Sequence, residues 1–403
     1  MSILPDLSQP WLEEFDAIRN FHDDEAHEQI RQLIGHTDFS QQLARIAEKT
    51  RSLPQDQSEI ASEAFVAQLE SVTRIQDFQA LEARFLSLAL SSMLAKLTCS
   101  GIDQLEPDHS YLFISNHRDI VLDPMIINWA LIQANKDSVY CAIGDNLLGS
   151  ETSKKLAQLN KCFAVLRSVK SPRAMVAAMR VQSAYIRHIK HNLNSSVWIA
   201  QREGRSKDNT DRTNPALLKM LSLAKPKEMD SADYIKTLHI VPVSLSYEWD
   251  PCDIQKAEQC LASKTGDYQK TGLQDLESIE LGLTGNKGLI QCTFDVNFNQ
   301  TISPDINMND LAAAIDRAIH RQYRLFPVNI VAWQQINPTE SSQLLHSTAV
   351  RNACSHELNP KTLHEARTSL SLRLNPHNEL LRQQVIRAYA QPVSNLLNAS
   401  GEH

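Results

Sequence analysis

The sequence predicts an α/β fold with a mixed, largely parallel sheet flanked by helices, a helical lobe before the sheet and helices after it. Three observations indicate this fold. Short apolar runs alternate with helical patterns between residues 98 and 335, as they do where helices cover a sheet. Apolar residues recur at helical spacing before residue 98 and again toward the end of the chain. The length of 403 residues suits about two or three domains.

The predicted domains follow these changes of pattern. Residues 1–97 are expected to form the helical lobe, because WLEEFDAIRNF and FVAQLESV keep apolar residues three and four positions apart, on either side of a break near Pro54. Residues 98–335 are expected to form the α/β domain. Residues 336–403 are expected to form a C-terminal helical cap.

Strands of the α/β domain are predicted where short apolar runs are bounded by polar turns. The first run, 111–114, is followed by Asp123-Pro124, which predicts a helix with Asp123 as its N-cap and Pro124 in its first turn. Further strands are expected at 138–144, 162–166, 196–200, 239–247 and 288–294, and helices at 171–190, 214–224 and 308–324.

Composition excludes several classes of protein. With 42% hydrophobic and 22% charged residues the chain has an ordinary globular balance. The apolar stretches that begin at residues 85 and 124 are shorter than the roughly 18–20 residues that a membrane span needs. The acidic N-terminus is unlike a secretory signal. We therefore expect a cytoplasmic protein, with peripheral attachment to the inner face of the membrane as an open alternative.

The seven cysteines are scattered and contain no C-x-x-C pair, which favours reduced thiols in the core over a disulfide framework. Neither a metal site nor a cofactor is predicted.

Charge is unevenly distributed along the chain. The net charge is −7, and residues 1–100 hold 16 acidic side chains against 8 basic ones. The window 161–227 instead holds 14 lysines and arginines against 3 acidic residues. This window is either a solvated basic face or a surface for phosphate, anionic lipid or an acidic carrier protein. No nucleic-acid partner is expected, because the chain is acidic and lacks aromatic residues interleaved with the basic ones.

Two candidate catalytic residues lie close together in the sequence. His117 directly follows the predicted strand 111–114, and Asp123 begins the next helix. Open α/β sheets bind their ligands at the carboxyl ends of the strands. A carboxylate that orients an imidazole allows the imidazole to act as a general base.

Basic residues follow two other predicted strands. Arg167 leaves the strand 162–166, where it could bind a phosphate or simply face solvent. The strand 196–200 is followed by a polar loop whose backbone and cations could bind an anion, or which could be an exposed loop. Its candidate residues are Glu203, Gly204, Arg205, Ser206 and Lys207.

Taken in this order, the motifs resemble those of the glycerolipid acyltransferases, and particularly the glycerol-3-phosphate acyltransferase branch. That family has an Asn-His motif followed by Asp, an aromatic strand ending in Arg, a Glu-Gly-x-Arg-Ser loop and an apolar strand with a central Pro. The resemblance covers about residues 98–335. The matching residues are Asn116-His117 with Asp123-Pro124, Phe163 to Arg167, Glu203 to Ser206, and Pro242.

The sequence departs from the family pattern at two places. Five residues separate His117 from Asp123 where the family has four, so either the intervening turn bulges or Asp119 takes the place of Asp123. We expect Asp123, because it precedes the proline. One residue is also missing between Gly204 and Arg205.

The resemblance implies transfer of a fatty acyl group from acyl-CoA or acyl carrier protein to a hydroxyl of glycerol 3-phosphate, in phospholipid synthesis. It implies that His117 is the general base and Asp123 its partner, and that Asn116, Arg167 and residues 203–207 bind the substrate. Two alternatives remain open. The acceptor could be a lysophospholipid such as 1-acylglycerol 3-phosphate, or the chain could be a catalytically inactive lipid or acyl-carrier binding protein of the same fold.

Overall fold

The computed structural model describes residues 13–41, 63–91, 96–166, 171–266, 272–303 and 305–402. The described strands form a seven-stranded sheet in the order β1-β7-β6-β2-β5-β3-β4. Among them, β6 and β7 pair antiparallel and the other neighbours pair parallel. The predicted mixed, largely parallel sheet is thereby confirmed. The strands are β1 Lys96–Ser100, β2 Leu112–Ser115, β3 Tyr140–Gly144, β4 Cys162–Val165, β5 Val197–Ala200, β6 Ile240–Tyr247 and β7 Leu289–Phe294.

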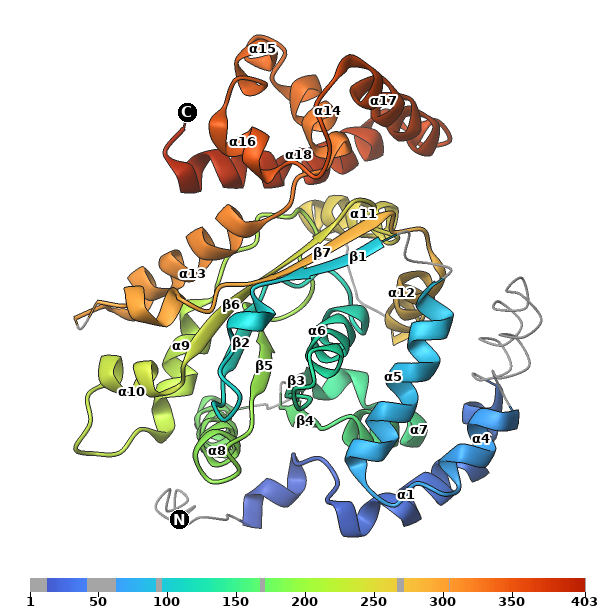
Figure 1. The fold of residues 1–403 in the computed structure, drawn as a ribbon, viewed down its shortest axis with the longest axis vertical. Coiled ribbons are helices and arrows are strands. Elements are labelled where there is room, and N and C mark those ends of the chain that lie inside the picture. Colours follow the sequence, from blue (N-terminus) through green and yellow to red (C-terminus); the bar gives the residue numbers. More distant parts are fainter. Residues whose placement is uncertain are drawn as a thin grey trace.

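Helices cover both faces of this sheet (Figure 1). Their boundaries carry ordinary capping signals: α8, for example, has Pro172 in its first turn, and the Ser171 hydroxyl accepts the N–H of Ala174. The helices before β6 are α1 Asp23–Gly35, α4 Glu63–Leu69, α5 Ile75–Ser91, α6 Leu122–Gln133, α7 Glu151–Leu159, α8 Pro172–His191, α9 Pro215–Leu221 and α10 Ser231–Thr237. Those after it are α11 Asp253–Thr265, α12 Gly272–Thr284, α13 Met308–Gln322, α14 Pro327–Ile336, α15 Ser341–Leu344, α16 Thr348–Ala353, α17 Pro360–Leu374 and α18 Glu379–Ser400.

The central strand β2 is buried on both faces, which explains its unbroken apolar run. Because successive side chains of a strand point to opposite faces, Phe113 belongs to one core and its neighbours Leu112 and Ile114 to another. Phe113 packs with Trp198 and the buried face of α6. Leu112 and Ile114 pack with residues of α8, α9 and α13.

The N-terminal helices form their own small core against α7. Residues of α1, α4 and α5 bury apolar side chains together, and Leu159 at the end of α7 joins them. These helices lie on the β3–β4 side of the sheet (Figure 1). The sequence did not predict strand β1, because its few residues continue the helical pattern that precedes them.

The C-terminal helices gather in one body at one end of the molecule (Figure 1). Their core includes Phe326 and Val331 from the region of α14 together with Val385 and Val393 of α18. The sequence prediction placed α14 in the α/β domain, which was expected to end at residue 335. In the structure α14 packs with α17 and α18, because its apolar side chains are buried there and not on the sheet. None of the helices in the described ranges is both long and apolar enough to cross a membrane.

Candidate active site

The loops after β2 and β5 begin side by side. We call residues 116–121 the β2 loop and residues 201–214 the β5 loop. Strands β2 and β5 are parallel neighbours with Ser115 opposite Ala200, so both loops leave the same edge of the sheet. The N–H of Gln201 donates to the carbonyl of Ser115 over 2.8 Å, and the N–H of Ser206 donates to the carbonyl of His117 over 2.8 Å. The structure therefore brings His117 together with the polar segment 203–207.

His117 is bonded to Asp123. Nδ1 of His117 lies 2.7 Å from Oδ2 of Asp123, whose side chain is 0% exposed, whereas the imidazole is 13% exposed. The imidazole also packs edge-on against Trp198, with ring centroids 5.8 Å apart. A carboxylate acceptor at Nδ1 fixes the tautomer with the hydrogen on that nitrogen. Nε2 is then the nitrogen that can take a proton from a substrate.

Asp123 accepts three further hydrogen bonds. Its Oδ2 accepts the N–H groups of Arg118 and Asp119 over 2.6 and 3.0 Å, and its Oδ1 accepts the hydroxyl of Tyr247 over 2.9 Å. Burial, followed by the negative charge of Asp123, raises the pKa of Tyr247 well above its ordinary value, so Tyr247 remains a donor. Sequence reasoning did not find this role of Tyr247, although the residue ends the apolar strand with the central proline.

Asp119 bonds to the backbone at the start of the following helix. Its Oδ1 accepts the N–H groups of Val121 and Leu122, both over 3.0 Å, and α6 begins at Leu122. The prediction that Asp123 is the N-cap was therefore wrong. The N-cap position is occupied by Val121, whose side chain makes no cap bond. The side chain of Asp123 turns back to the β2 loop. The longer spacing between His117 and Asp123 is accommodated in this turn.

Asn116 is fully buried behind His117. Its amide nitrogen donates to the carbonyl of Leu245 over 2.9 Å, and its amide oxygen accepts the N–H of Leu245 over 2.8 Å. The prediction from the resemblance gave Asn116 a substrate contact. In the structure this side chain instead joins the end of β2 to β6, and thereby supports the position of His117.

The segment 203–207 forms the first part of the β5 loop. Gly204 is exposed and has a φ of +73°, a left-handed conformation that favours glycine. Glu203 is exposed, Lys207 is half-buried, and Ser206 is buried beside the backbone of His117. Arg205 is half-buried, and its Nη2 donates to the Ser278 hydroxyl of α12 over 3.1 Å. Arg167 lies outside the described residues.

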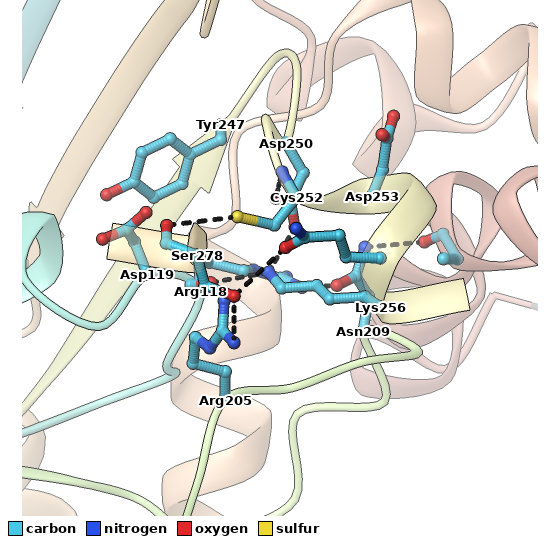
Figure 2. Close-up of polar contacts among 12 residues, drawn as sticks. Arg118, Asp119, Arg205, Asn209, Tyr247, Asp250, Cys252, Asp253, Lys256 and Ser278 are labelled. Atoms are coloured by element: carbon cyan, nitrogen blue, oxygen red, sulfur yellow. Dashed lines mark hydrogen bonds and ion pairs between the residues drawn. The ribbon is translucent and has the colours of Figure 1, made fainter. Parts of the chain in front are cut away.

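Four charged groups that sequence reasoning missed lie in or beside these loops: Arg118, Asp211 and Lys256 are buried, and Asp250 is half-buried. Figure 2 labels three of them, Arg118, Asp250 and Lys256. The guanidinium of Arg118 binds Asn209 and, over 2.5 Å, Oδ2 of Asp211. Lys256 of α11 donates to the carbonyl of Arg118 over 2.6 Å and pairs with Asp250. Although burial alone would raise the pKa of Asp250, the nearby charge of Lys256 lowers it below its ordinary value. These groups are spread along the chain, so no local motif pointed to them.

The comparison with known families agrees with this geometry. Residues 96–246 match the family model described as Acyltransferase. This part of the chain is similar to an acyltransferase domain. The matched range runs from β1 almost to the end of β6 and includes both loops and the bonded pair His117 and Asp123. No curated protein matches the chain.

The matched region supports an O-acyltransferase enzyme. Its geometry suits that reaction. An imidazole oriented by a buried carboxylate can take the proton of a hydroxyl, and a neighbouring loop with cations and an exposed glycine of positive φ can receive an anionic substrate.

Proposed function

We propose that this acyltransferase domain moves a fatty acyl group from a thioester to a hydroxyl of glycerol 3-phosphate, in phospholipid synthesis. The observation that carries the proposal is the chain of hydrogen bonds from His117 through Asp123 to Tyr247, placed at the carboxyl end of β2 beside the β5 loop. The resemblance of both loops to the glycerol-3-phosphate acyltransferase motifs supports the choice of acceptor.

The chemistry needs one general base. As the acceptor oxygen attacks the thioester carbon, Nε2 of His117 takes the hydroxyl proton, and Asp123 stabilises the imidazolium that forms. The tetrahedral intermediate collapses, the carbon–sulfur bond breaks, and the imidazolium returns its proton to the leaving thiolate. The products are an ester and a free thiol. A positioned base of this kind accelerates proton transfer by about 10²–10⁴-fold.

The cations of the β5 loop are assigned to the acceptor phosphate. Arg205 lies in the segment whose backbone bonds to His117, and its guanidinium can offer paired donors to phosphate oxygens. Lys207 and Arg167 are proposed as further phosphate contacts, and Glu203 as a partner for an acceptor hydroxyl. The alternative acceptor, 1-acylglycerol 3-phosphate, also carries a phosphate, so it would use the same cations.

The donor is proposed to be acyl-CoA or acyl carrier protein. The basic window 161–227, with its 14 lysines and arginines, would attract either the phosphates of CoA or the acidic surface of a carrier protein. The same charges would favour a peripheral position on an anionic membrane, where the lipid product belongs.

A thiol-release assay tests the proposal. Palmitoyl-CoA and an acyl carrier protein thioester are each combined with glycerol 3-phosphate or 1-acylglycerol 3-phosphate, and wild type is compared with His117→Ala. Acceptor-dependent thiol release that His117→Ala loses supports the proposed reaction and selects the acceptor. Thiol release that His117→Ala retains would contradict the assigned base. Binding of the acyl donor without release under any combination would favour the inactive binding protein.

A further inference from the structure

Arg118 connects the two loops of the site through its side chain. It directly follows His117, yet its side chain runs to the far part of the β5 loop and is 4% exposed. Nη1 donates to the side-chain oxygen of Asn209, and Nη2 donates to Oδ2 of Asp211 over 2.5 Å. One guanidinium thus contacts two acceptors that are two residues apart in the other loop.

The backbone of Arg118 is fixed at the same time. Its N–H donates to Asp123 over 2.6 Å, and its carbonyl accepts Nζ of Lys256 over 2.6 Å. Lys256 is 2% exposed and is itself paired with Asp250. The main chain of Arg118 cannot move without breaking these contacts. Its side chain therefore extends from a fixed position in the β2 loop.

The part of the β5 loop that binds the Arg118 side chain contains two residues with positive φ. Asn209 has a φ of +62° and Asp211 a φ of +47°. This left-handed region is uncommon for residues other than glycine, although asparagine and aspartate adopt it more readily than most. Helix α18 contacts this part of the loop from the other side. The side-chain amide of Asn209 donates to the carbonyl of Ala388 over 2.8 Å, and the carbonyl of Asn209 accepts the side-chain amide of Asn395 over 2.9 Å. His320 lies 2.9 Å from the carbonyl of Asp211.

The β5 loop is therefore bonded to the β2 loop both within the segment 203–207 and directly after it. Ser206 is bonded to the carbonyl of His117, and the residues that follow Lys207 are bonded to Arg118. We propose that Arg118 is a positioning residue, which holds the β5 loop at a fixed distance from His117. This inference rests on the proposed function, in which His117 is the base and the β5 loop binds the acceptor. Arg118 itself is assigned no contact with substrate.

Arginine suits this task better than lysine. Its planar guanidinium presents several donors in a fixed arrangement, so it can hold two acceptors at once, whereas an ammonium group is a compact point charge on a flexible stem. The guanidinium also lies 5.2 Å from the ring centroid of Tyr323, which adds a cation–π contact. We therefore expect Arg118→Lys to restore the function of Arg118 only in part.

The experiment compares full-length wild type, Arg118→Gln, Arg118→Lys and a control, Arg19→Gln. Arg19 forms an ion pair with Glu25 in the N-terminal lobe, so the control removes a guanidinium away from both loops. Hydrogen exchange is measured in peptides covering residues 116–121 and 201–214. Steady-state kinetics then give kcat and the KM of donor and acceptor, with the substrates that the thiol-release assay selects.

The expected result has two parts. Arg118→Gln raises hydrogen exchange in the β5 loop at least tenfold and leaves the N-terminal lobe unchanged. It also raises the acceptor KM and lowers kcat, so that kcat/KM for the acceptor falls by about 100-fold, while the donor KM stays the same. A merely structural role would reduce the active fraction, and would lower kcat without changing either KM. Arg19→Gln is expected to behave as wild type in both loops.

Unchanged exchange in the β5 loop, or an unchanged acceptor KM in folded Arg118→Gln, would overturn the inference. Should Arg118→Gln fail to accumulate as folded protein, Asn395→Ala loosens the same loop from the opposite side and is expected to raise its exchange about threefold. Should the wild-type chain transfer no acyl group, the proposed function fails, while the exchange experiment still decides whether Arg118 holds the loop.

Discussion

The hydroxyl of Tyr247 donates to Oδ1 of Asp123 over 2.9 Å, at the far side of the carboxylate that binds His117. The carboxylate is thereby held at both oxygens, by a strand on one side and by the β2 loop on the other. Its orientation toward the imidazole depends on residues from two separate parts of the chain.

Tyr247→Phe should lower kcat by about tenfold. The substitution keeps the aromatic ring and removes a hydrogen bond to a charged group, which contributes about 1.5–3 kcal/mol. Asp123 can then rotate away from the imidazole, while the loops that bind donor and acceptor are unaffected. Steady-state kinetics should therefore show a lower kcat with both KM values unchanged, and an unchanged kcat would contradict the supporting role of Tyr247.

His117→Ala should lower kcat by at least about 100-fold, because it removes the proposed general base. We expect the sheet to remain folded, so circular dichroism should change little. The thermal midpoint should fall, because the imidazole is only 13% exposed and the buried carboxylate of Asp123 loses a partner. His109→Ala serves as a matched control, since His109 precedes β2 and lies near His239 at the start of β6. Equal losses in both variants would argue against a catalytic role for His117.

Arg205→Ala should raise the acceptor KM at least tenfold and change kcat less, if the guanidinium binds the acceptor phosphate equally in ground and transition states. Exposed Arg202 in the same loop supplies the control. Arg202→Ala removes the same charge and should leave the acceptor KM within about twofold of wild type. An acceptor KM that responds equally to both variants would point to a general charge effect.

Gly282→Ala should destabilise the protein by about 1–3 kcal/mol and lower kcat, because a Cβ at Gly282 would collide with the carboxylate of Asp119. Asp119 accepts the N–H groups of Val121 and Leu122, which directly precede Asp123, so the displacement reaches the site. Gly149→Ala is the control, because a Cβ at Gly149 meets nothing within 4 Å. Urea denaturation with kinetics of both variants checks this prediction, and wild-type behaviour of Gly282→Ala would refute it.

The stability of the protein should fall between about pH 6.5 and 4 because of His239. Burial, followed by the charges of His109, Lys190 and His191, lowers the pKa of His239 to about 4, and Glu106 opposes this shift. The unfolded chain binds a proton at the ordinary histidine pKa of about 6.5. Between these two pH values the unfolded state holds a proton that the folded state lacks. The free energy of unfolding that His239 contributes above pH 6.5 is therefore lost as the pH falls toward 4.

The test of this pH dependence uses His239→Asn, because His239 has a φ of +49° and asparagine tolerates that conformation. The urea midpoint is measured at pH 7.5 and pH 5. The drop between the two should be smaller in His239→Asn than in wild type, and unchanged in His364→Asn, which alters an exposed histidine of α17. A drop of the same size in all three proteins would exclude His239 as the cause.

Features of the fold that depend on local pattern could be predicted from the sequence. The buried run of β2 and the polar residues after β2 and β5 are local signals, and parallel strands bring such residues to one edge. The sequence also predicted Asp123, and not Asp119, as the partner of His117, because only Asp123 precedes a proline. The N-cap of α6 was not predictable, because it is Val121, whose side chain makes no cap bond.

Contacts between distant parts of the chain could not be predicted. Lys256 and the carbonyl of Arg118 are 138 residues apart in sequence, and neither residue stands out from other cations in a helix or loop. Helix α14 was assigned to the wrong unit for a related reason. Its apolar side chains indicate burial, but the sequence does not say whether the sheet or another helix covers them.

The amide of Asn116 carries the same donor and acceptor as a peptide group, and it occupies the next pairing position beside Leu245. The ladder to β6 therefore gains one more rung from a side chain, while the main chain is already free to turn away. A histidine placed immediately afterwards can leave the sheet at once without exposing an unpaired backbone group of β6. An asparagine followed by a histidine is thus a way to end a buried strand abruptly. Asn116→Asp lacks the amide donor and should weaken the pairing between the end of β2 and Leu245 of β6.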